Sequence, residues 1–269
     1  MSDAVASVLD RILAQTRQEV ERRRRARPLP LNTRESIPRD DSPGRFRAAL
    51  ETEGIGVIAE FKRRSPSAGT LREQPQLPEI VRAYERGGAL AASILTEEAN
   101  FDGSLDDLRE ARAECSLPLL RKDFIVDDYQ LHEAVAAGAD AVLLIVAALS
   151  DDELGSLQAA ARALGLDVLT EVHDRVELRR ALELGAEIIG INNRDLRDFS
   201  VDVSRTEALM EDLPSDVIAV SESGITDAEQ VRRLDGQGVS AVLVGETLMR
   251  STDPAAAVRA LTAWRHEMI

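Results

Sequence analysis

The sequence has little of several residue types on which common structural and catalytic devices depend. Among its 269 residues there is one cysteine, Cys115, so an intramolecular disulfide and a cysteine-based metal cluster are both excluded. Aromatic residues make up only 3% of the chain, and the core must therefore be mostly aliphatic. A single free cysteine fits a protein of the reducing cytoplasm, which is the compartment we expect.

Long hydrophobic runs and excess positive charge are also absent. No apolar stretch approaches the roughly 20 residues of a membrane-spanning helix, and the first residues lack the basic and apolar regions of a secretory signal, so we expect neither. The net charge of −15 disfavours nucleic-acid binding, which requires a basic face. The one dense basic run, residues 22–25, is typical of a solvated helix face.

Lysine is the scarcest charged residue. Of the 33 Lys and Arg residues, only Lys62 and Lys122 are lysines. An arginine stays protonated essentially always, whereas the ammonium of a lysine can be tuned to donate a proton. Both lysines are therefore candidates for acid–base chemistry. A G+C-rich genome and a salt-adapted, acidic proteome would each produce this bias, and the sequence does not separate the two.

The chain does contain a regular alternation of short apolar runs and amphipathic stretches. Residues 4–26 carry apolar side chains at helical spacing, and the proline-containing segment 28–43 is typical of a connector. From residue 57 onward, eight apolar runs predict β-strands with helical stretches between them. The predicted strands span residues 57–61, 91–95, 119–121, 141–146, 167–170, 188–191, 217–220 and 241–244.

This alternation predicts an α/β fold, a (β/α)8 TIM barrel with an N-terminal helical extension. The predicted strands are continuous apolar runs, which suits a parallel sheet covered on its outer face. A doubly wound open sheet is the alternative, but it would usually carry a Gly-rich turn where this chain has E-F-K-R-R-S-P-S. We expect residues 1–269 to form a single barrel domain, in which residues 1–50 are the N-terminal helix and connector.

Polar residues gather at the C-terminal ends of the predicted strands, where barrel enzymes build their active sites. Each one alone is usually a solvated loop residue or part of a structural ion pair. Crowded at one barrel mouth, however, such charges shift one another's pKa values, which is how acids and bases are made. The set comprises Glu60, Lys62, Thr96, Glu97, Lys122, Asp123, Glu171, Asn192, Asn193, Arg194, Ser221, Glu222, Ser223, Gly224, Gly245 and Glu246.

Glycines follow the last two predicted strands, in the segments S-E-S-G-I and V-L-V-G-E. Barrels commonly bind phosphate at these two places, so the pairing of Gly224 with Gly245 predicts a phosphate site. A metal site is not predicted, because His132, His173 and His266 lack ligand spacing such as H-E-x-x-H. We interpret these histidines as surface or packing residues. A nucleophilic serine is equally unsupported, since no G-x-S-x-G motif is present.

Eight segments, one per predicted strand, resemble those of indole-3-glycerol-phosphate synthases and occur in that family's order. The N-terminal helix and connector also resemble the extension that precedes the family's barrel. Ala68 precedes Gly69 where many members have another small or basic residue, a minor departure that puts little in doubt. The segments are I-A-E-F-K-R-R-S-P-S, S-I-L-T-E-E-A-N-F-D-G-S, P-L-L-R-K-D-F-I-V, G-A-D-A-V-L-L-I-V, L-T-E-V-H, I-G-I-N-N-R-D-L, S-E-S-G-I and V-L-V-G-E-T-L-M-R.

The resemblance implies a reaction in tryptophan biosynthesis, carried out by a carboxy-lyase without metal, nucleotide or redox cofactor. The substrate would be 1-(2-carboxyphenylamino)-1-deoxyribulose 5-phosphate, and the product indole-3-glycerol phosphate. The oligomeric state stays open, with a monomer among the alternatives. Two rival interpretations are another phosphate-binding barrel enzyme, such as a sugar-phosphate isomerase, and a non-catalytic binding protein. The latter would be expected to have lost Lys122, Glu171 or Asn192, and all three are present.

The resemblance also implies roles for single residues. Lys122 matches the general acid, and Glu171 matches a carboxylate that acts as base or stabilises a cationic intermediate. Glu60 and Lys62 match a pair that holds the substrate and assists proton transfer, and which of Lys62, Glu60 and Lys122 serves the dehydration stays open. Asn192 completes the catalytic set. The matching substrate contacts are Asn192, Arg194, Glu222 and Ser223 for the carboxylate and hydroxyls, Phe101, Phe124 and Leu143 for the aromatic ring, and Ser65, Gly224, Gly245 and the Glu246 backbone for the phosphate.

Overall fold

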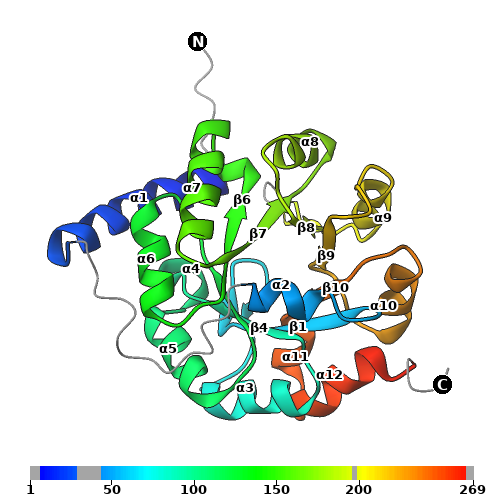
Figure 1. Cartoon of the computed structure of the whole chain (residues 1–269). Helices are drawn as coiled ribbons and strands as arrows, with labels where there is room; N and C mark the ends of the chain where they lie inside the picture. The colour runs from blue at the N-terminus through cyan, green and yellow to red at the C-terminus, as the bar shows by residue number, and fades with distance from the viewer. Residues whose placement is uncertain (1–6, 29–43, 196–198, 265–269) are drawn as a thin grey trace.

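Eight parallel strands close into a barrel in the computed structural model of the chain, which describes residues 7–28, 44–195 and 199–264 (Figure 1). Each strand pairs with its neighbours in chain order, and the first strand pairs with the last. All eight lie where the sequence predicts them, and this confirms the TIM barrel. The strands are β1 (Gly56–Phe61), β4 (Ala91–Leu95), β5 (Leu119–Lys122), β6 (Ala141–Ile145), β7 (Asp167–Val172), β8 (Ile188–Asn192), β9 (Ile218–Glu222) and β10 (Ala241–Val244).

Helices surround the barrel and cover its outer face (Figure 1). Most begin with an Asp or Ser whose side chain accepts a hydrogen bond from the first turn, as Ser150 does from Glu153 N. The helices are α1 (Val8–Ala26), α2 (Arg45–Leu50), α3 (Leu77–Arg86), α4 (Glu98–Phe101), α5 (Leu105–Glu114), α6 (Asp128–Ala136), α7 (Asp151–Ala163), α8 (Arg175–Glu183), α9 (Ser204–Met210), α10 (Ala228–Asp235), α11 (Glu246–Arg250) and α12 (Pro254–Thr262).

Some short elements are additions to the predicted pattern. A hairpin of β2 (Arg64–Ser65) and β3 (Gly69–Thr70) follows β1, and a 3-10 turn (Val146–Ala148) follows β6. Both lie after strand ends and so stand near the barrel mouth. They are too short for periodicity to reveal, because a pattern needs several residues before it can be recognised.

Helix α1 matches the predicted N-terminal helix and lies along α6 and α7 (Figure 1). Its start is fixed by a capping box, in which Ser7 and Asp10 satisfy each other's backbone N–H groups. Arg17 on its outer side lies 3.0 Å from Glu153 of α7, and the hydroxyl of Tyr129 on α6 donates to Arg27 O at 2.9 Å. Most of the predicted connector, residues 28–43, lies outside the described residues, as does His266.

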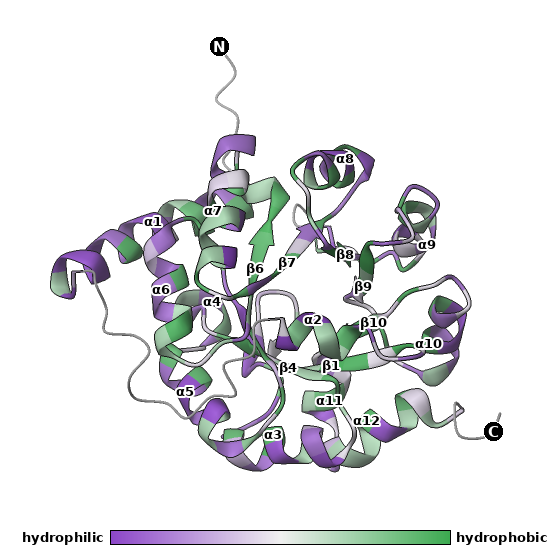
Figure 2. Ribbon diagram, viewed as in Figure 1, coloured by the Kyte–Doolittle hydropathy of each residue, from purple (hydrophilic) through white to green (hydrophobic). Residues whose placement is uncertain are grey.

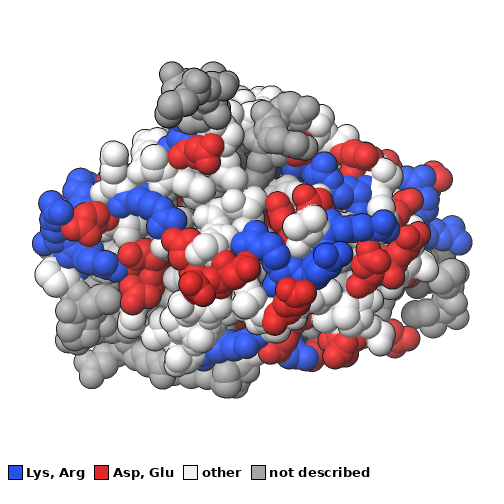
Figure 3. Space-filling model, turned by 90° about the horizontal axis from the view of Figure 1, so that it is seen from above, with Lys and Arg blue, Asp and Glu red and all other residues white. Residues whose placement is uncertain are grey.

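The core is aliphatic, as the shortage of aromatic residues predicts. Figure 2 shows the hydrophobic strands at the centre and hydrophilic faces on the surrounding helices. Figure 3 shows basic and acidic side chains interspersed over one face of the molecule, without an extended basic patch on that face.

The N-terminal end of the barrel is closed by helix α2. Phe46 and Leu50 of this helix are fully buried against the strand starts. Asp140, in the loop before β6, accepts hydrogen bonds from Arg45 at 3.1 Å, from Arg112 at 3.0 Å and from Leu119 N at 2.8 Å. These ion pairs hold the loops together at this end of the barrel. The sequence analysis did not predict them.

Candidate active site

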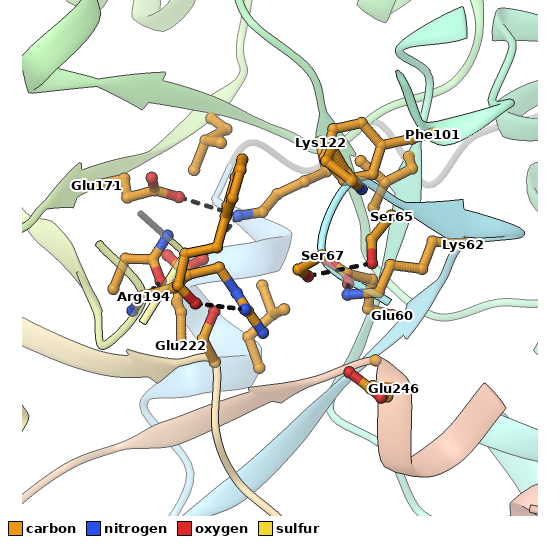
Figure 4. A pocket seen from close by; sticks show the side chains of 18 of the residues that line it. Glu60, Lys62, Ser65, Ser67, Phe101, Lys122, Glu171, Arg194, Glu222 and Glu246 are labelled. Carbon is orange, nitrogen blue, oxygen red and sulfur yellow. Dashed lines mark hydrogen bonds and ion pairs between the residues drawn. The ribbon is translucent and has the colours of Figure 1, made fainter. Parts of the chain in front are cut away.

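A cavity of about 380 Å³ opens at the C-terminal end of the barrel, where the strand ends and the following loops meet. All fifteen site residues predicted from the sequence line this cavity. In Figure 4 the side chains of Glu60, Lys122, Glu171 and Glu222 point toward a common space, each from a separate strand, and other labelled residues come from the following loops and helices. The structure thus brings the predicted residues together, and what each one does there remains a prediction.

Lys122 ends β5, and its side chain reaches toward two other strands. The ammonium Nζ donates to Glu171 Oε2 on β7 at 3.0 Å and to Glu222 Oε2 on β9 at 2.7 Å (Figure 4). Burial alone lowers the pKa of Lys122, but the carboxylates of Glu171, Glu222 and Glu60 outweigh burial and raise this pKa. The ammonium is therefore charged at neutral pH.

The two glutamates beside Lys122 have opposite pKa shifts. Burial raises the pKa of Glu171, but Lys122, His173 and Asn192 outweigh it and hold this pKa well below its usual range. Burial raises the pKa of Glu222 to about 7, because Lys122 offsets it only in part and the negative charge of Glu171 adds to the rise. Glu171 thus stays a carboxylate, while Glu222 exchanges a proton near neutrality.

A second ion pair lies at the end of β1. Lys62 Nζ is 2.6 Å from Glu60 Oε1, and both side chains are largely shielded from solvent. The turn at Gly245 passes so close that a Cβ there would lie 2.4 Å from Glu60 Oε1 and 2.9 Å from Lys62 Nζ. Gly245 is therefore required by this pair. Behind the strand, the buried hydroxyl of Tyr84 donates to Glu60 O at 3.0 Å and fixes the strand end.

Two further glycines shape the barrel mouth at β8 and β9. A Cβ on Gly190 of β8 would lie 2.1 Å from Glu222 Oε1, so any side chain there would displace the carboxylate. The sequence analysis did not single out Gly190, although a lone glycine inside a predicted strand signals a close approach. Ser223 and Gly224 follow with φ of 66° and 81°, in the left-handed region, and turn the chain sharply after β9.

Asn192 ends β8, and Arg194 lies in the loop that follows. Asn192 Oδ1 accepts a hydrogen bond from Arg194 N at 3.0 Å, and the Arg194 guanidinium donates to Phe199 O at 3.0 Å. Both residues line the cavity beside Phe199. The guanidinium is thus held at the cavity wall by its own loop, where a charged donor suits an anionic substrate group.

Helix α1 supplies an apolar wall that the sequence analysis missed. Val8, Leu9 and Ile12 line the cavity from the N-terminal extension. The helical spacing of these side chains was visible in the sequence, but no pattern showed which part of the barrel the helix would cover. They complete an apolar lining suited to a planar ring. The predicted ring contacts in the same lining are Phe101, Phe124 and Leu143.

Three polar residues expected on the rim turn away from the cavity. Thr96 donates to Asp123 at 2.6 Å and accepts a hydrogen bond from the buried Arg121. Asn193 and Ser221 hydrogen-bond to each other at 3.1 Å and meet α9. The reason is the two-residue period of a strand, since neighbours of an inward-facing residue face the helices.

His173 was interpreted as a surface or packing residue, but it lies beside the cavity. It follows β7 directly, and its Nε2 is 3.4 Å from Glu171 Oε1. Its Nδ1 is 3.0 Å from Glu177 Oε2 on α8. The signal that could have found it is its position two residues after Glu171, which returns a strand side chain to the same face.

Metal and membrane sites are not found in the described part of the chain. Residues 7–28, 44–195 and 199–264 contain no group of three His, Cys, Asp or Glu side chains arranged to hold a metal ion. None of the helices in these residues is long and apolar enough to cross a membrane.

Comparison with solved structures supports the fold. A thiamine phosphate pyrophosphorylase from Pyrococcus furiosus superposes with a TM-score of 0.59 at 20% identity, over 80% of this chain and 97% of that one. A mutant tryptophan synthase alpha-subunit from the same organism gives a TM-score of 0.60 at 14% identity, over 78% of this chain and 98% of that one. At such low identity these likenesses show the barrel architecture alone.

Comparison with protein families and curated sequences is more specific. The family model described as indole-3-glycerol phosphate synthase matches residues 9–261. Indole-3-glycerol phosphate synthase 2 of Streptomyces coelicolor is 52% identical over 80% of this chain and 84% of its own length. The indole-3-glycerol phosphate synthase of Leptothrix cholodnii is 46% identical over 96% of this chain and 100% of its own length. The chain therefore belongs to the indole-3-glycerol phosphate synthase family.

Proposed function

We propose that the cavity at the barrel mouth is where this chain carries out the reaction of its family. The enzyme converts 1-(2-carboxyphenylamino)-1-deoxyribulose 5-phosphate to indole-3-glycerol phosphate, with loss of carbon dioxide and water, in tryptophan biosynthesis. One observation carries the assignment of the site, namely the ammonium of Lys122 held between the buried carboxylates of Glu171 and Glu222. This arrangement joins a proton donor to fixed negative charge, which the reaction needs.

The substrate is proposed to lie across the cavity, with its phosphate near Gly245 and its aromatic ring against the apolar wall. Ser65, Gly224 and the backbone at Glu246 line the first region, and small residues there let backbone N–H groups approach a phosphate. The charge of Lys62 beside the Gly245 turn adds attraction for the phosphate. The sugar carbons then come between the two lysines.

Lys122 is proposed to start the chemistry. The aromatic carbon that bears the carboxylate attacks the sugar ketone and forms the new carbon–carbon bond. As that bond forms, Lys122 Nζ gives a proton to the ketone oxygen, which becomes a hydroxyl group. The electron pair for the bond leaves the ring π-system, so positive charge develops at the anilino nitrogen.

Glu171 is proposed to stabilise this cationic intermediate. Its pKa lies well below the usual range, so it is a carboxylate throughout the working pH range. Fixed negative charge in a cavity shielded from water stabilises a developing cation far more than it would in bulk solvent. Carbon dioxide then leaves, and the electron pair of the broken bond restores the aromatic ring.

Lys62 and Glu60 are proposed to serve the dehydration. The hydroxyl group formed in the first step must take up a second proton to leave as water. Lys122 has already given its proton, whereas Lys62 is still charged beside Glu60 at 2.6 Å. The proton lost from the sugar carbon next to the nitrogen then goes to a carboxylate, and the indole ring is complete.

Substituting Glu171 tests this assignment. We expect Glu171→Gln, which keeps the shape and removes the charge, to lower kcat by at least about 100-fold while KM stays within about threefold. A matched control is Glu183→Gln on α8, which makes the same exchange at an exposed position outside the cavity. An unchanged kcat with a raised KM would instead make Glu171 a substrate-binding residue and would overturn its proposed role.

The barrel and α1 are proposed to act as a single domain, because α1 contributes Val8, Leu9 and Ile12 to the cavity. We also propose that the enzyme works as a monomer in the cytoplasm. Cys115 is a buried free thiol whose pKa is raised by burial, which agrees with a reducing compartment. Size-exclusion chromatography with light scattering tests the monomer.

A further inference from the structure

His173 occupies a bridge between the cavity and helix α8. Its ring nitrogen Nδ1 lies 3.0 Å from Glu177 Oε2, and its backbone N–H donates to the same oxygen at 2.8 Å. The other ring nitrogen, Nε2, is buried and makes no well-aligned hydrogen bond among the described residues. The polar atom it faces is Glu171 Oε1, at an ion-pair distance of 3.4 Å. The imidazole is thus anchored on one side and aimed at Glu171 on the other.

The two oxygens of Glu171 have separate partners. Oε2 accepts the hydrogen bond from Lys122 at 3.0 Å, and Oε1 faces His173 at 3.4 Å. The side chain of Glu171 is 3% exposed, so neither oxygen has bulk water to replace a lost partner. When Lys122 gives up its proton, Oε2 loses a cationic partner while Oε1 keeps its own.

We propose that His173 is a positioning residue that keeps the Glu171 carboxylate charged and oriented while Lys122 is deprotonated. This inference rests on the proposed role of Glu171 as the stabiliser of the cationic intermediate. Glu177 acts through His173, because its contact with Nδ1 fixes the ring and leaves Nε2 directed at Glu171. A carboxylate that orients a histidine in this way is a recurrent arrangement in active sites.

The charges around His173 support this role. Burial lowers the pKa of His173, but the carboxylates of Glu171 on β7 and Glu177 on α8 outweigh burial and raise the pKa to about 10. Lys122 lies beyond Glu171 and is the nearest further charge that the hydrogen bonds connect. The imidazole is therefore cationic at neutral pH, so both of its nitrogens carry a proton.

Substitutions of His173 give the first test. We expect His173→Ala to lower kcat on the order of 10-fold, the size of effect that outer partners of active-site groups have, with KM changed less than about threefold. His173→Gln retains a donor at similar reach and should recover part of the lost kcat. The matched control is His132→Gln on α6, which should keep wild-type kcat. If His173→Ala proves unable to fold, Glu177→Gln is the second variant, with an expected threefold loss of kcat.

A double-mutant cycle separates positioning from simple packing. In the Glu171→Gln background, His173→Ala should lower kcat by less than about twofold, because the group on which it acts has lost its charge. Equal losses of kcat in both backgrounds would overturn the inference about His173. A wild-type kcat for His173→Ala, together with a lowered kcat for Glu171→Gln, would also overturn it. Both outcomes would leave the proposed role of Glu171 in place. A wild-type kcat for Glu171→Gln would overturn the proposed role of Glu171 and this inference with it.

Discussion

The two ends of the barrel both bury carboxylates, but lysine holds them at only one end. At the N-terminal end, the carboxylate of Asp140 is held by Arg45 and Arg112. At the C-terminal end, the carboxylates proposed to take part in catalysis are held by Lys62, Lys122 and a histidine, while Arg121 holds the neighbouring Asp123. The chain has 33 Lys and Arg residues, and its only two lysines both lie at the C-terminal end.

This difference separates ion pairs that hold the fold from ion pairs that move protons. A guanidinium stays protonated, so the arginine pairs keep one charge state at every physiological pH. A lysine or histidine changes its proton occupancy when its neighbours change, and the glutamates around Lys122 already show pKa shifts of opposite sign. A lysine partner therefore distinguishes the carboxylates proposed for catalysis, whereas arginine pairs occur at both ends of the barrel.

The largest expected effect comes from replacing Lys122 by arginine, the cation that holds Asp140 at the N-terminal end. Lys122→Arg keeps the positive charge but replaces a tunable acid by a guanidinium, and kcat should fall on the order of 10²–10⁴-fold. Lys122→Ala should be at least as impaired while retaining its circular dichroism spectrum. A steady-state assay of indole-3-glycerol phosphate formation measures both. Turnover near that of the wild type in either folded variant would break the comparison.

The second prediction removes the buried carboxylate at the N-terminal end of the barrel. Asp140→Ala leaves Arg45 and Arg112 without their shared carboxylate and leaves Leu119 N without an acceptor. We expect the free energy of unfolding to fall by about 3–5 kcal/mol, as when one partner of a buried pair is removed. Urea denaturation measures the loss, and kcat at a temperature where the protein stays folded should be unchanged. A selective loss of kcat would show that this end also serves the chemistry.

A smaller effect concerns pH. The pKa of Glu222 is raised to about 7, so this group favours the folded state below its ordinary pKa of 4.5 and loses that contribution as pH rises through 7. As pH falls through about 7, Glu222 takes up a proton and holds Lys122 less firmly. We expect kcat/KM to drop about 10-fold on this limb. Glu222→Gln should be low and flat from pH 6 to pH 8, and an unchanged inflection would assign the titration to another group.

The smallest effect should come from salt, which acts on the exposed surface more than on either barrel end. The chain carries a net charge of −15, and exposed pairs such as Arg175 with Glu211 are accessible to ions. Raising potassium chloride from about 0.1 M to 1 M shortens the Debye length from about 10 Å to 3 Å and should raise Tm by a few degrees. The kcat ratio of Lys122→Arg to wild type should stay constant, and a Tm that falls with salt would count against surface repulsion.

Much of the barrel follows from the sequence because its signals are local. Each strand is a short apolar run with a polar residue at its end, as at Glu60 and Lys122, so strand position and site position come from the same pattern. The observed strands β7, β8 and β9 extend one or two residues beyond the predicted ends. Polar residues such as Glu171 are parts of the strands themselves, which apolar patterning does not detect.

Other features depend on approach in space and so could not be predicted. A lone glycine inside the predicted strand indicates a close approach at Gly190, but the sequence does not show that its partner is the Glu222 carboxylate on β9. The same holds for Ile12, which reaches the cavity because α1 lies along α6 and α7. His173 is different, because its position two residues after Glu171 was visible in the sequence and indicates the same side of the strand. Its lack of metal-ligand spacing carries no information about this contact.

Closure of the barrel also sets the order in which the site is assembled during synthesis. Strand β1 pairs with β10, so Gly56 can pair with Ala241 only after about 180 further residues have been synthesised. At a rate of roughly 5–20 residues per second, β1 emerges from the ribosome on the order of ten seconds before its last partner. Until then one edge of β1 is unpaired and exposed to other chains. The Glu60–Lys62 pair and the Gly245 turn meet only at the end of this interval, so a nascent chain cannot catalyse the reaction before nearly all of it has been translated.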